Sequence, residues 1–137
     1  MTATDTIQRR LFPSRLAPAA ARGALAPLGG IVSEDTLKAT ELLVSELVTN
    51  AVRHAGLRSE DWIDMRVEVL DDRVRVSVTD PGHGFARPPP DPRPDRSSGW
   101  GLFLVGQIAD RWGLERERET AVWFEIERRS PVAAAGR

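Results

Sequence analysis

Three polar residues on one predicted helix, Glu46, Asn50 and His54, are the best placed in this chain to do chemistry. They are spaced i, i+4 and i+8, so on a helix they form a single stripe. A carboxylate, a side-chain amide and an imidazole coordinate hard cations or transfer protons. A helix that only faced solvent would carry Lys or Arg in that stripe. The apolar residues of the segment fall mainly on the other side, where they can pack into a core: Leu47, Val48, Ala51, Val52 and Ala55.

A second candidate residue, Asp80, ends a predicted strand in the same alternating phase as three valines. Its carboxylate is therefore expected to point towards the core side of the sheet. An inward carboxylate needs a hydrogen-bond donor, because burial without one is costly. The amino group of an adenine ring is a suitable donor, and the glycines that follow, Gly82 and Gly84, let a flat ligand come close. Alternatively, Asp80 caps the turn that Asp-Pro-Gly forms, and on this residue alone that interpretation is favoured.

A glycine-containing segment at residues 98–102, S-G-W-G-L, leads into another predicted helix. Backbone N–H groups at a helix N-terminus bind phosphate, and Gly99 and Gly101 permit a close approach. The segment lacks the G-K-[ST] of a Walker A loop, and no βαβ unit surrounds it as a dinucleotide-binding fingerprint requires. Taken alone, a G-x-G pattern is better explained as a structural turn.

Thr120 shares the phase of Val122, Phe124 and Ile126 in the last predicted strand, so its hydroxyl is also expected to point inward. A β-branched residue at a strand end needs no function. An inward Asp80 and an inward Thr120 on separate strands of one sheet would nevertheless frame a single polar pocket.

These residues must be positioned by helices and strands that the sequence pattern predicts. Ser33 is a suitable N-cap for a long helix that ends at Gly56. Shorter helices are predicted at residues 18–28 and 102–112, the second ending at Trp112. Strands are predicted at residues 62–70 and 73–80, where apolar residues alternate with mostly polar ones and the apolar phase is expected to face the core. A short edge strand is predicted at residues 8–12, and the last strands at residues 113–118 and 121–127. Residues 81–98 are too rich in turn formers for regular structure.

The order of these elements predicts an α+β fold, a two-layer sandwich in which a mixed, mostly antiparallel sheet is covered on one face by helices. One domain is expected at residues 8–128, between disordered termini at residues 1–7 and 129–137.

Composition excludes several classes of function. The 137 residues carry a formal net charge of -1 and no cysteine. Disulfides, thiolate metal sites and a Cys nucleophile are therefore excluded, and no basic field argues for nucleic acid. The sequence shows no signal-peptide core and no apolar stretch of about 20 residues, so a cytoplasmic location is expected.

The order and spacing of the motifs resemble the Bergerat ATP-binding fold, the histidine-kinase-like ATPase superfamily. Residues 46–54 resemble its N box, residues 80–84 its first glycine box and residues 99–102 its second. Within the superfamily, three stretches look like the small anti-sigma-factor serine/threonine protein kinases abundant in actinobacteria: S-E-L-V-T-N-A-V-R-H-A, G-L-F-L-V-G-Q-I-A-D-R-W-G and T-A-V-W-F-E. The resemblance covers roughly residues 8–128, nearly the whole chain.

The resemblance implies a site for ATP and Mg²⁺. Asn50 would coordinate Mg²⁺, and Glu46 would be the general base that activates the attacking hydroxyl. Asp80 would bind the adenine amino group, assisted by Thr120 through water. The two glycine boxes would shape the adenine wall and hold the phosphates, through Gly82, Gly84, Gly99, Gly101 and Leu102.

Two further roles stay open. His54 would either orient a lid or satisfy a buried hydrogen bond, and the second is favoured. Arg53 would either touch phosphate or remain a solvated surface residue, and again the second is favoured. Residues 85–98 would form the lid, with three arginines that could meet nucleotide or a partner: Arg87, Arg93 and Arg96.

The implied function is that of an ATP-binding anti-sigma factor and serine protein kinase. It would phosphorylate a STAS-domain anti-anti-sigma protein and so control the availability of a sigma factor. The family also implies a homodimer, and neither nucleic acid nor membrane is expected as a direct partner. One alternative is a catalytically weak, nucleotide-gated protein-binding module, although such a module has no need of Glu46. The other is a structural domain with coincidental motifs.

Overall fold

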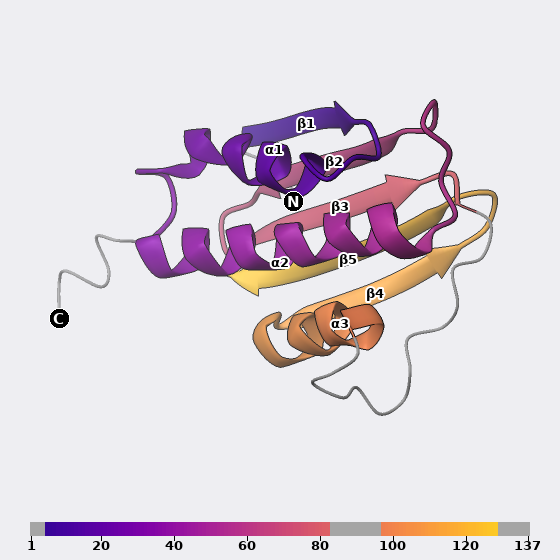
Figure 1. Ribbon diagram of the computed structural model, residues 1–137. Coiled ribbons are helices and arrows are strands. Elements are labelled where there is room, and N and C mark those ends of the chain that lie inside the picture. Colours follow the sequence, from indigo (N-terminus) through magenta and orange to yellow (C-terminus); the bar gives the residue numbers. More distant parts are fainter. Residues whose placement is uncertain (1–4, 83–96, 129–137) are drawn as a thin grey trace, which may run out of the picture.

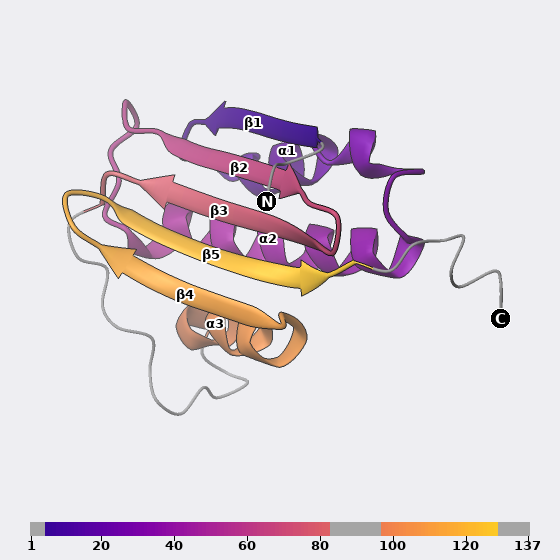
Figure 2. The ribbon, with the colours of Figure 1, turned by 180° about the vertical axis from the view of Figure 1, so that it is seen from behind.

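The computed structural model describes residues 5–82 and 97–128, which form two layers (Figure 1). One layer is a five-stranded sheet within these residues, and the other contains the helices α1 (Ala17–Gly23), α2 (Glu34–His54) and α3 (Ser97–Ile108). The three helices lie on one face of the sheet, and Figure 2 shows the strands of the other face with no described helix over them. The predicted α+β sandwich is therefore confirmed. Among the described helices, none is both long and apolar enough to cross a membrane.

The strands of the sheet follow the order β1-β2-β3-β5-β4, and each neighbouring pair is antiparallel. Their bounds are β1 (Asp5–Leu11), β2 (Ile63–Val69), β3 (Arg73–Asp80), β4 (Arg111–Arg116) and β5 (Thr120–Glu127). Side chains alternate between the two faces of a sheet. The phase predicted to face the core is buried along β2 and β3, so the inward direction of these two strands was predicted correctly.

Helix α2 crosses the inner face of the sheet and carries the polar stripe. Ser33 caps it as predicted, because its Oγ accepts a hydrogen bond from the Thr36 N–H at 3.1 Å. The helix ends at His54, and Gly56 adopts a φ of 68°, a left-handed conformation that favours glycine. Its apolar side is buried in the core: Leu43, Val44, Leu47, Val48 and Ala51.

Two predictions in the N-terminal part are corrected. Strand β1 takes in residues 5–7, which were assigned to a disordered terminus, because they pair with β2. The helix predicted at residues 18–28 is interrupted: α1 ends at Gly23, and a separate 3₁₀ turn covers Ala26–Leu28. Pro27 has no N–H to continue an α-helical ladder, and a glycine lowers helix propensity, so the break has a local cause.

The boundary between the last helix and the strand that follows it is also corrected. Helix α3 ends at Ile108, and Trp112 lies in β4 instead of on the helix. The N–H of Asp110 donates to the Glu125 carbonyl at 2.9 Å, and its carboxylate accepts from the Glu127 N–H. Pairing with β5 therefore takes the chain out of the helix, although the apolar spacing continued to favour helix.

Candidate functional site

Asp80 and Thr120 lie side by side at one end of the sheet, on the face that the helices cover. They are directly opposite each other in the β3–β5 pair. The two residues are 4% and 3% exposed, respectively. Both side chains therefore point inward, as the alternation predicted. A carboxylate and a hydroxyl thus meet at the point where β3 ends.

Gly82 connects this pair to the end of helix α2. Its N–H donates to Asp80 Oδ1 at 2.7 Å, and its carbonyl accepts a hydrogen bond from Thr120 Oγ1 at 3.3 Å. A Cβ at this position would lie 2.5 Å from the Ala55 carbonyl oxygen and 2.6 Å from Asp80 Oδ1. Two backbone segments therefore come so close that only glycine fits between them.

Burial raises the pKa of the Asp80 carboxyl above its ordinary value. Loss of solvation is the largest cause, and the negative charges of Asp61 and Glu119 raise this pKa further. The hydrogen bond from the Gly82 N–H acts in the opposite direction, because it stabilises the charged form. The fold thus holds this carboxylate at an energetic cost, a property that is common in binding and catalytic sites.

Asn50 on helix α2 faces the same cleft as Asp80. The cleft lies between α2 and the β3–β5 pair, and its lining adds four apolar residues to these two polar ones: Leu47, Ala51, Val78 and Val122. Its volume is about 10 Å³, which is room for about one water molecule. A larger ligand at Asp80 therefore requires this cleft to widen.

The other members of the predicted stripe stand apart from this cleft. Glu46 lies one turn before Asn50 on α2 and is half-buried. It does not line the cleft, and its side chain has no hydrogen bond or ion pair with any residue that the structure describes. Arg53 is exposed. His54 is the last residue of α2, and its side chain lies outside what the structure describes. Among the described side chains of the stripe, Asn50 alone lines the space beside Asp80.

The remaining predicted site residues lie in α3 or outside the described residues. Helix α3 begins at Ser97, so Gly99 and Gly101 belong to the start of the helix and not to a loop before it. The N–H of Gly99 is among the first backbone donors, which have no partner within a helix. Leu102 is 3% exposed and packs in the core. Gly84 and the predicted lid as far as residue 96, including its three arginines, lie outside the described residues.

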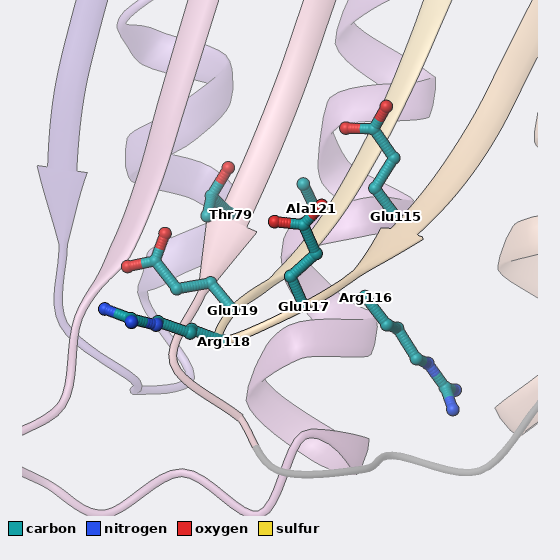
Figure 3. Close-up of a pocket in the computed structure, with 7 residues that line it drawn as sticks. All are labelled: Thr79, Glu115, Arg116, Glu117, Arg118, Glu119 and Ala121. Carbon is teal, nitrogen blue, oxygen red and sulfur yellow. The ribbon is translucent and has the colours of Figure 1, made fainter.

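A larger hollow lies on the opposite face of the sheet at the same end (Figure 3). Thr79 and Ala121, which are paired between β3 and β5, contribute to its lining. The other lining residues belong to the β4–β5 hairpin and are exposed: Glu115, Arg116, Glu117, Arg118 and Glu119. Its volume is about 840 Å³. We nevertheless take the inner cleft as the candidate site, because its polar groups are less exposed and converge on one space.

Two carboxylates that raise the pKa of Asp80, those of Asp61 and Glu119, were not predicted from the sequence as part of the site. Asp61 lies in the loop before β2, where its carboxylate accepts from the Arg58 N–H at 2.7 Å. A loop residue has no periodic signal, so its proximity to Asp80 could not be predicted. Glu119 directly precedes Thr120 in the sequence. Because Thr120 was a predicted site residue, the position of Glu119 near the site could have been predicted.

The α+β fold, a five-stranded antiparallel sheet covered on one face by helices, is the fold that the motif resemblance implies. The profile of the protein family described as Histidine kinase-like ATPase domain matches residues 13–126. The chain belongs to this family.

Curated relatives of the chain include bacterial protein kinases. The serine-protein kinase RsbW of Staphylococcus epidermidis is 31% identical over 98 residues, which cover 62% of this chain and 62% of the relative. RsbW of Staphylococcus aureus (strain JH9) is 28% identical over 96 residues, covering 61% of this chain and 60% of the relative. The chain therefore matches less than two thirds of the length of these relatives.

Solved structures with the same fold include a light-regulated kinase. The blue-light activated histidine kinase of Erythrobacter litoralis EL346 has a TM-score of 0.55 and 29% identity, covering 69% of this chain and 31% of that one. The histidine kinase domain of the same protein has a TM-score of 0.56 and 22% identity, covering 80% and 59%. At 22% identity, the similarity to this second structure shows only that the fold is shared.

Proposed function

We propose that this protein is an ATP-binding anti-sigma factor and serine protein kinase. The observation that carries the proposal is the buried Asp80 carboxylate, which is paired with Thr120 and faces the cleft lined by Asn50. Membership of the histidine-kinase-like ATPase family supports ATP as the ligand. Similarity to proteins named serine-protein kinase supports the transfer of phosphate to serine.

Asp80 is proposed to accept a hydrogen bond from the adenine amino group. A buried carboxylate has lost much of its solvation, and a donor on the ligand offsets that loss. Gly82 would fix the carboxylate through its N–H and let the adenine ring approach, with Gly84 extending the same wall. Thr120, which already donates to the Gly82 carbonyl, would support the adenine through water.

Mg²⁺ is the metal that this function requires, and Asn50 is its proposed ligand. Mg²⁺ at phosphate sites uses few protein ligands, because phosphate oxygens and waters fill the other positions. The described residues fit this arrangement: Asn50 offers a hard oxygen, and no group of three or more His, Cys, Asp or Glu side chains there could hold a metal by itself. Bound there, Mg²⁺ would neutralise charge on the phosphates.

Transfer forms a bond between the serine Oγ and the γ-phosphorus and breaks the bond from that phosphorus to ADP. Glu46 is proposed to accept the serine proton as the oxygen attacks. The start of α3, with Gly99 and Gly101, is proposed to hold the phosphates, since a helix N-terminus attracts anions. Leu102 would anchor that end of the helix in the core.

The proposed protein substrate is a serine of a STAS-domain anti-anti-sigma protein, and the proposed binding partner is a sigma factor. Phosphorylation of the antagonist would leave the sigma factor bound to this protein. A cytoplasmic location would match these partners, with no direct role for nucleic acid or membrane. The formal net charge of -1 supports protein partners over nucleic acid.

The test separates ATP binding from phosphate transfer. The protein is incubated with Mg-ATP and the cognate antagonist, phosphoserine is measured by mass spectrometry, and ATP affinity is measured by calorimetry. We expect the wild-type protein to do both, and Glu46→Gln to bind ATP but form no phosphoserine. ATP binding without phosphoserine in the wild-type protein would instead indicate a nucleotide-gated binding module, a function favoured by the position of Glu46 outside the cleft lining.

A further inference from the structure

Arg116, the last residue of β4, stands in one row with the two polar residues of the candidate site. It is directly opposite Thr120 in the β4–β5 pair, and Thr120 is directly opposite Asp80 in the β3–β5 pair. Residues that are directly opposite each other in an antiparallel sheet lie on the same face. The Cα atoms of Arg116 and Asp80 are therefore two strand spacings apart, roughly 10 Å, on the face that the helices cover.

The side chain of Arg116 is exposed at this end of the sheet. Arg116 also contributes to the lining of the outer hollow, but in Figure 3 its guanidinium points away from Glu117 and Glu119. Arg118, the other arginine of the hairpin, is also exposed and points the opposite way in the same view. The two arginines therefore present their charges on different sides of the hairpin.

The start of helix α3 lies towards the same end of the sheet. Only Ala109 and Asp110 separate the end of α3 from the start of β4, and Trp112 on β4 lies against Gly106 on the helix. The helix and the strand therefore run side by side in opposite directions, as Figures 1 and 2 show. The first turn of α3, which is the proposed phosphate site, thus lies towards the end of β4 that carries Arg116.

The charges around Asp80 show why a cation is needed beside this row. ATP is an anion, and the negative charges of Asp61 and Glu119 both act on Asp80. None of the described residues that line the inner cleft is a cation. Phosphates brought close to these carboxylates are repelled unless a positive group stands near them.

We propose that Arg116 binds the phosphates of the nucleotide and so makes the site select ATP over unphosphorylated adenosine. The inference rests on the proposed function, because adenine at Asp80 and phosphates at the start of α3 place the ligand on the side of Arg116. A guanidinium donates two parallel N–H groups to phosphate oxygens, and it stays protonated at every physiological pH. Arg116 on β4 and Mg²⁺ at Asn50 on α2 would then neutralise the phosphates from two elements of the fold.

The test is calorimetric titration of ATP, with Mg²⁺ present, and of adenosine into the full chain. Arg116→Met should weaken ATP binding by about tenfold, because hydrogen bonds to a charged group are lost. The same variant should bind adenosine within about twofold of the wild type, since adenosine has no phosphate. Arg118→Met is the matched control: it removes the same charge from the same hairpin and should leave both affinities within about twofold of the wild type.

Three outcomes would overturn the role of Arg116 while the wild type still binds ATP: unchanged ATP affinity in Arg116→Met, an equal loss of ATP and adenosine binding in that variant, or the same loss of ATP binding in Arg118→Met. A wild-type protein that binds neither ligand would overturn the proposed function and this inference together. Circular dichroism of each variant checks that it is folded. If Arg116→Met does not fold, Arg116→Gln takes its place with the same expected result.

Discussion

The two hollows at the end of the β3–β5 pair share their strands but not their chemistry. The inner hollow has a volume of about 10 Å³ and is lined in part by Asp80, which is 4% exposed. The outer one, about 840 Å³, is lined by Thr79, Ala121 and an exposed charged hairpin (Figure 3). A step of one residue along β3 leads from one face to the other. At this end of the sheet, the candidate site is therefore identified by the burial of a charged group and not by the volume of the hollow.

The physical reason lies in solvation. The exposed charges of the hairpin already interact with water, so a partner there gains little. The carboxylate of Asp80 has lost part of its solvation, as its raised pKa indicates, so a hydrogen-bond donor placed beside it gains more. The predictions below test this comparison, and the first, the second and the last use a residue of the outer face as their control.

The largest expected effect separates chemistry from binding on the inner face. Glu46→Gln should lower phosphate transfer to serine by about 10²–10⁴-fold, because the amide cannot accept the proton. ATP affinity should change by less than about twofold, since Glu46 does not line the cleft. Quantitative phosphoserine analysis and calorimetry measure the two effects. Glu115→Gln, in the outer hollow, is the control, and equal transfer rates for the wild type and Glu46→Gln would remove Glu46 from the mechanism.

A second prediction compares two glycines on opposite faces. Gly82→Ala brings a Cβ against the Ala55 carbonyl oxygen, so it should lower the free energy of unfolding by about 1–3 kcal/mol and weaken ATP binding by at least about tenfold. Gly113→Ala, on the outer face, brings a Cβ to 2.6 Å from the Trp123 ring. It should also reduce stability but leave ATP affinity unchanged. Denaturant unfolding and calorimetry measure both, and equal ATP affinities for the two variants would contradict the close contact at Gly82.

A third prediction follows from the raised pKa of Asp80. The folded protein binds this proton more tightly than the unfolded chain, so the contribution of Asp80 to stability falls as pH rises from the ordinary value of about 3.9 through the raised value. Asp80→Asn should therefore match the wild-type Tm in acid and exceed it at neutral pH. Thermal unfolding across this pH range measures the difference in Tm between the two proteins. The other titrating groups are the same in both proteins, so their effects cancel in this difference. A less stable Asn variant at neutral pH would show that burial of Asp80 carries no cost.

The smallest expected effect tests the link between the two faces. Glu119 helps to raise the pKa of Asp80, so Glu119→Gln should move the loss of adenosine binding to slightly lower pH. Adenosine is the ligand because it has no phosphate to titrate. Glu117→Gln in the same hairpin is the control, since Glu117 is not among the causes of the raised pKa of Asp80. Identical profiles for the two variants would exclude an electrostatic effect of Glu119.

Local rules allowed much of the site to be predicted from the sequence. Period-two alternation indicated that Asp80 and Thr120 point inward, and capping chemistry located both ends of α2, at Ser33 and Gly56. Each of these features depends on residues that are close in the sequence. They could therefore be predicted without knowledge of the fold.

The features that could not be predicted depend on contacts between distant segments. The contact of Gly82 with Ala55 requires the end of β3 to meet the end of α2. The end of α3 depends on Asp110 bonding to β5, which overrides an apolar spacing that favours helix. The effect of Asp61 on Asp80 requires the position of a loop with no sequence pattern.

The central claim is that Asp80 on the inner face holds ATP, and calorimetric titration of ATP into the wild type, Asp80→Asn and Thr79→Val tests it most directly. The side-chain carbonyl of the Asn can still accept a hydrogen bond from the Gly82 N–H. Its NH₂ group would then face the adenine amino group, and two donors cannot form a hydrogen bond with each other. Asp80→Asn should therefore weaken binding by at least about a hundredfold, while Thr79→Val on the outer face stays within about twofold of the wild type. ATP binding by Asp80→Asn at wild-type affinity would contradict the account.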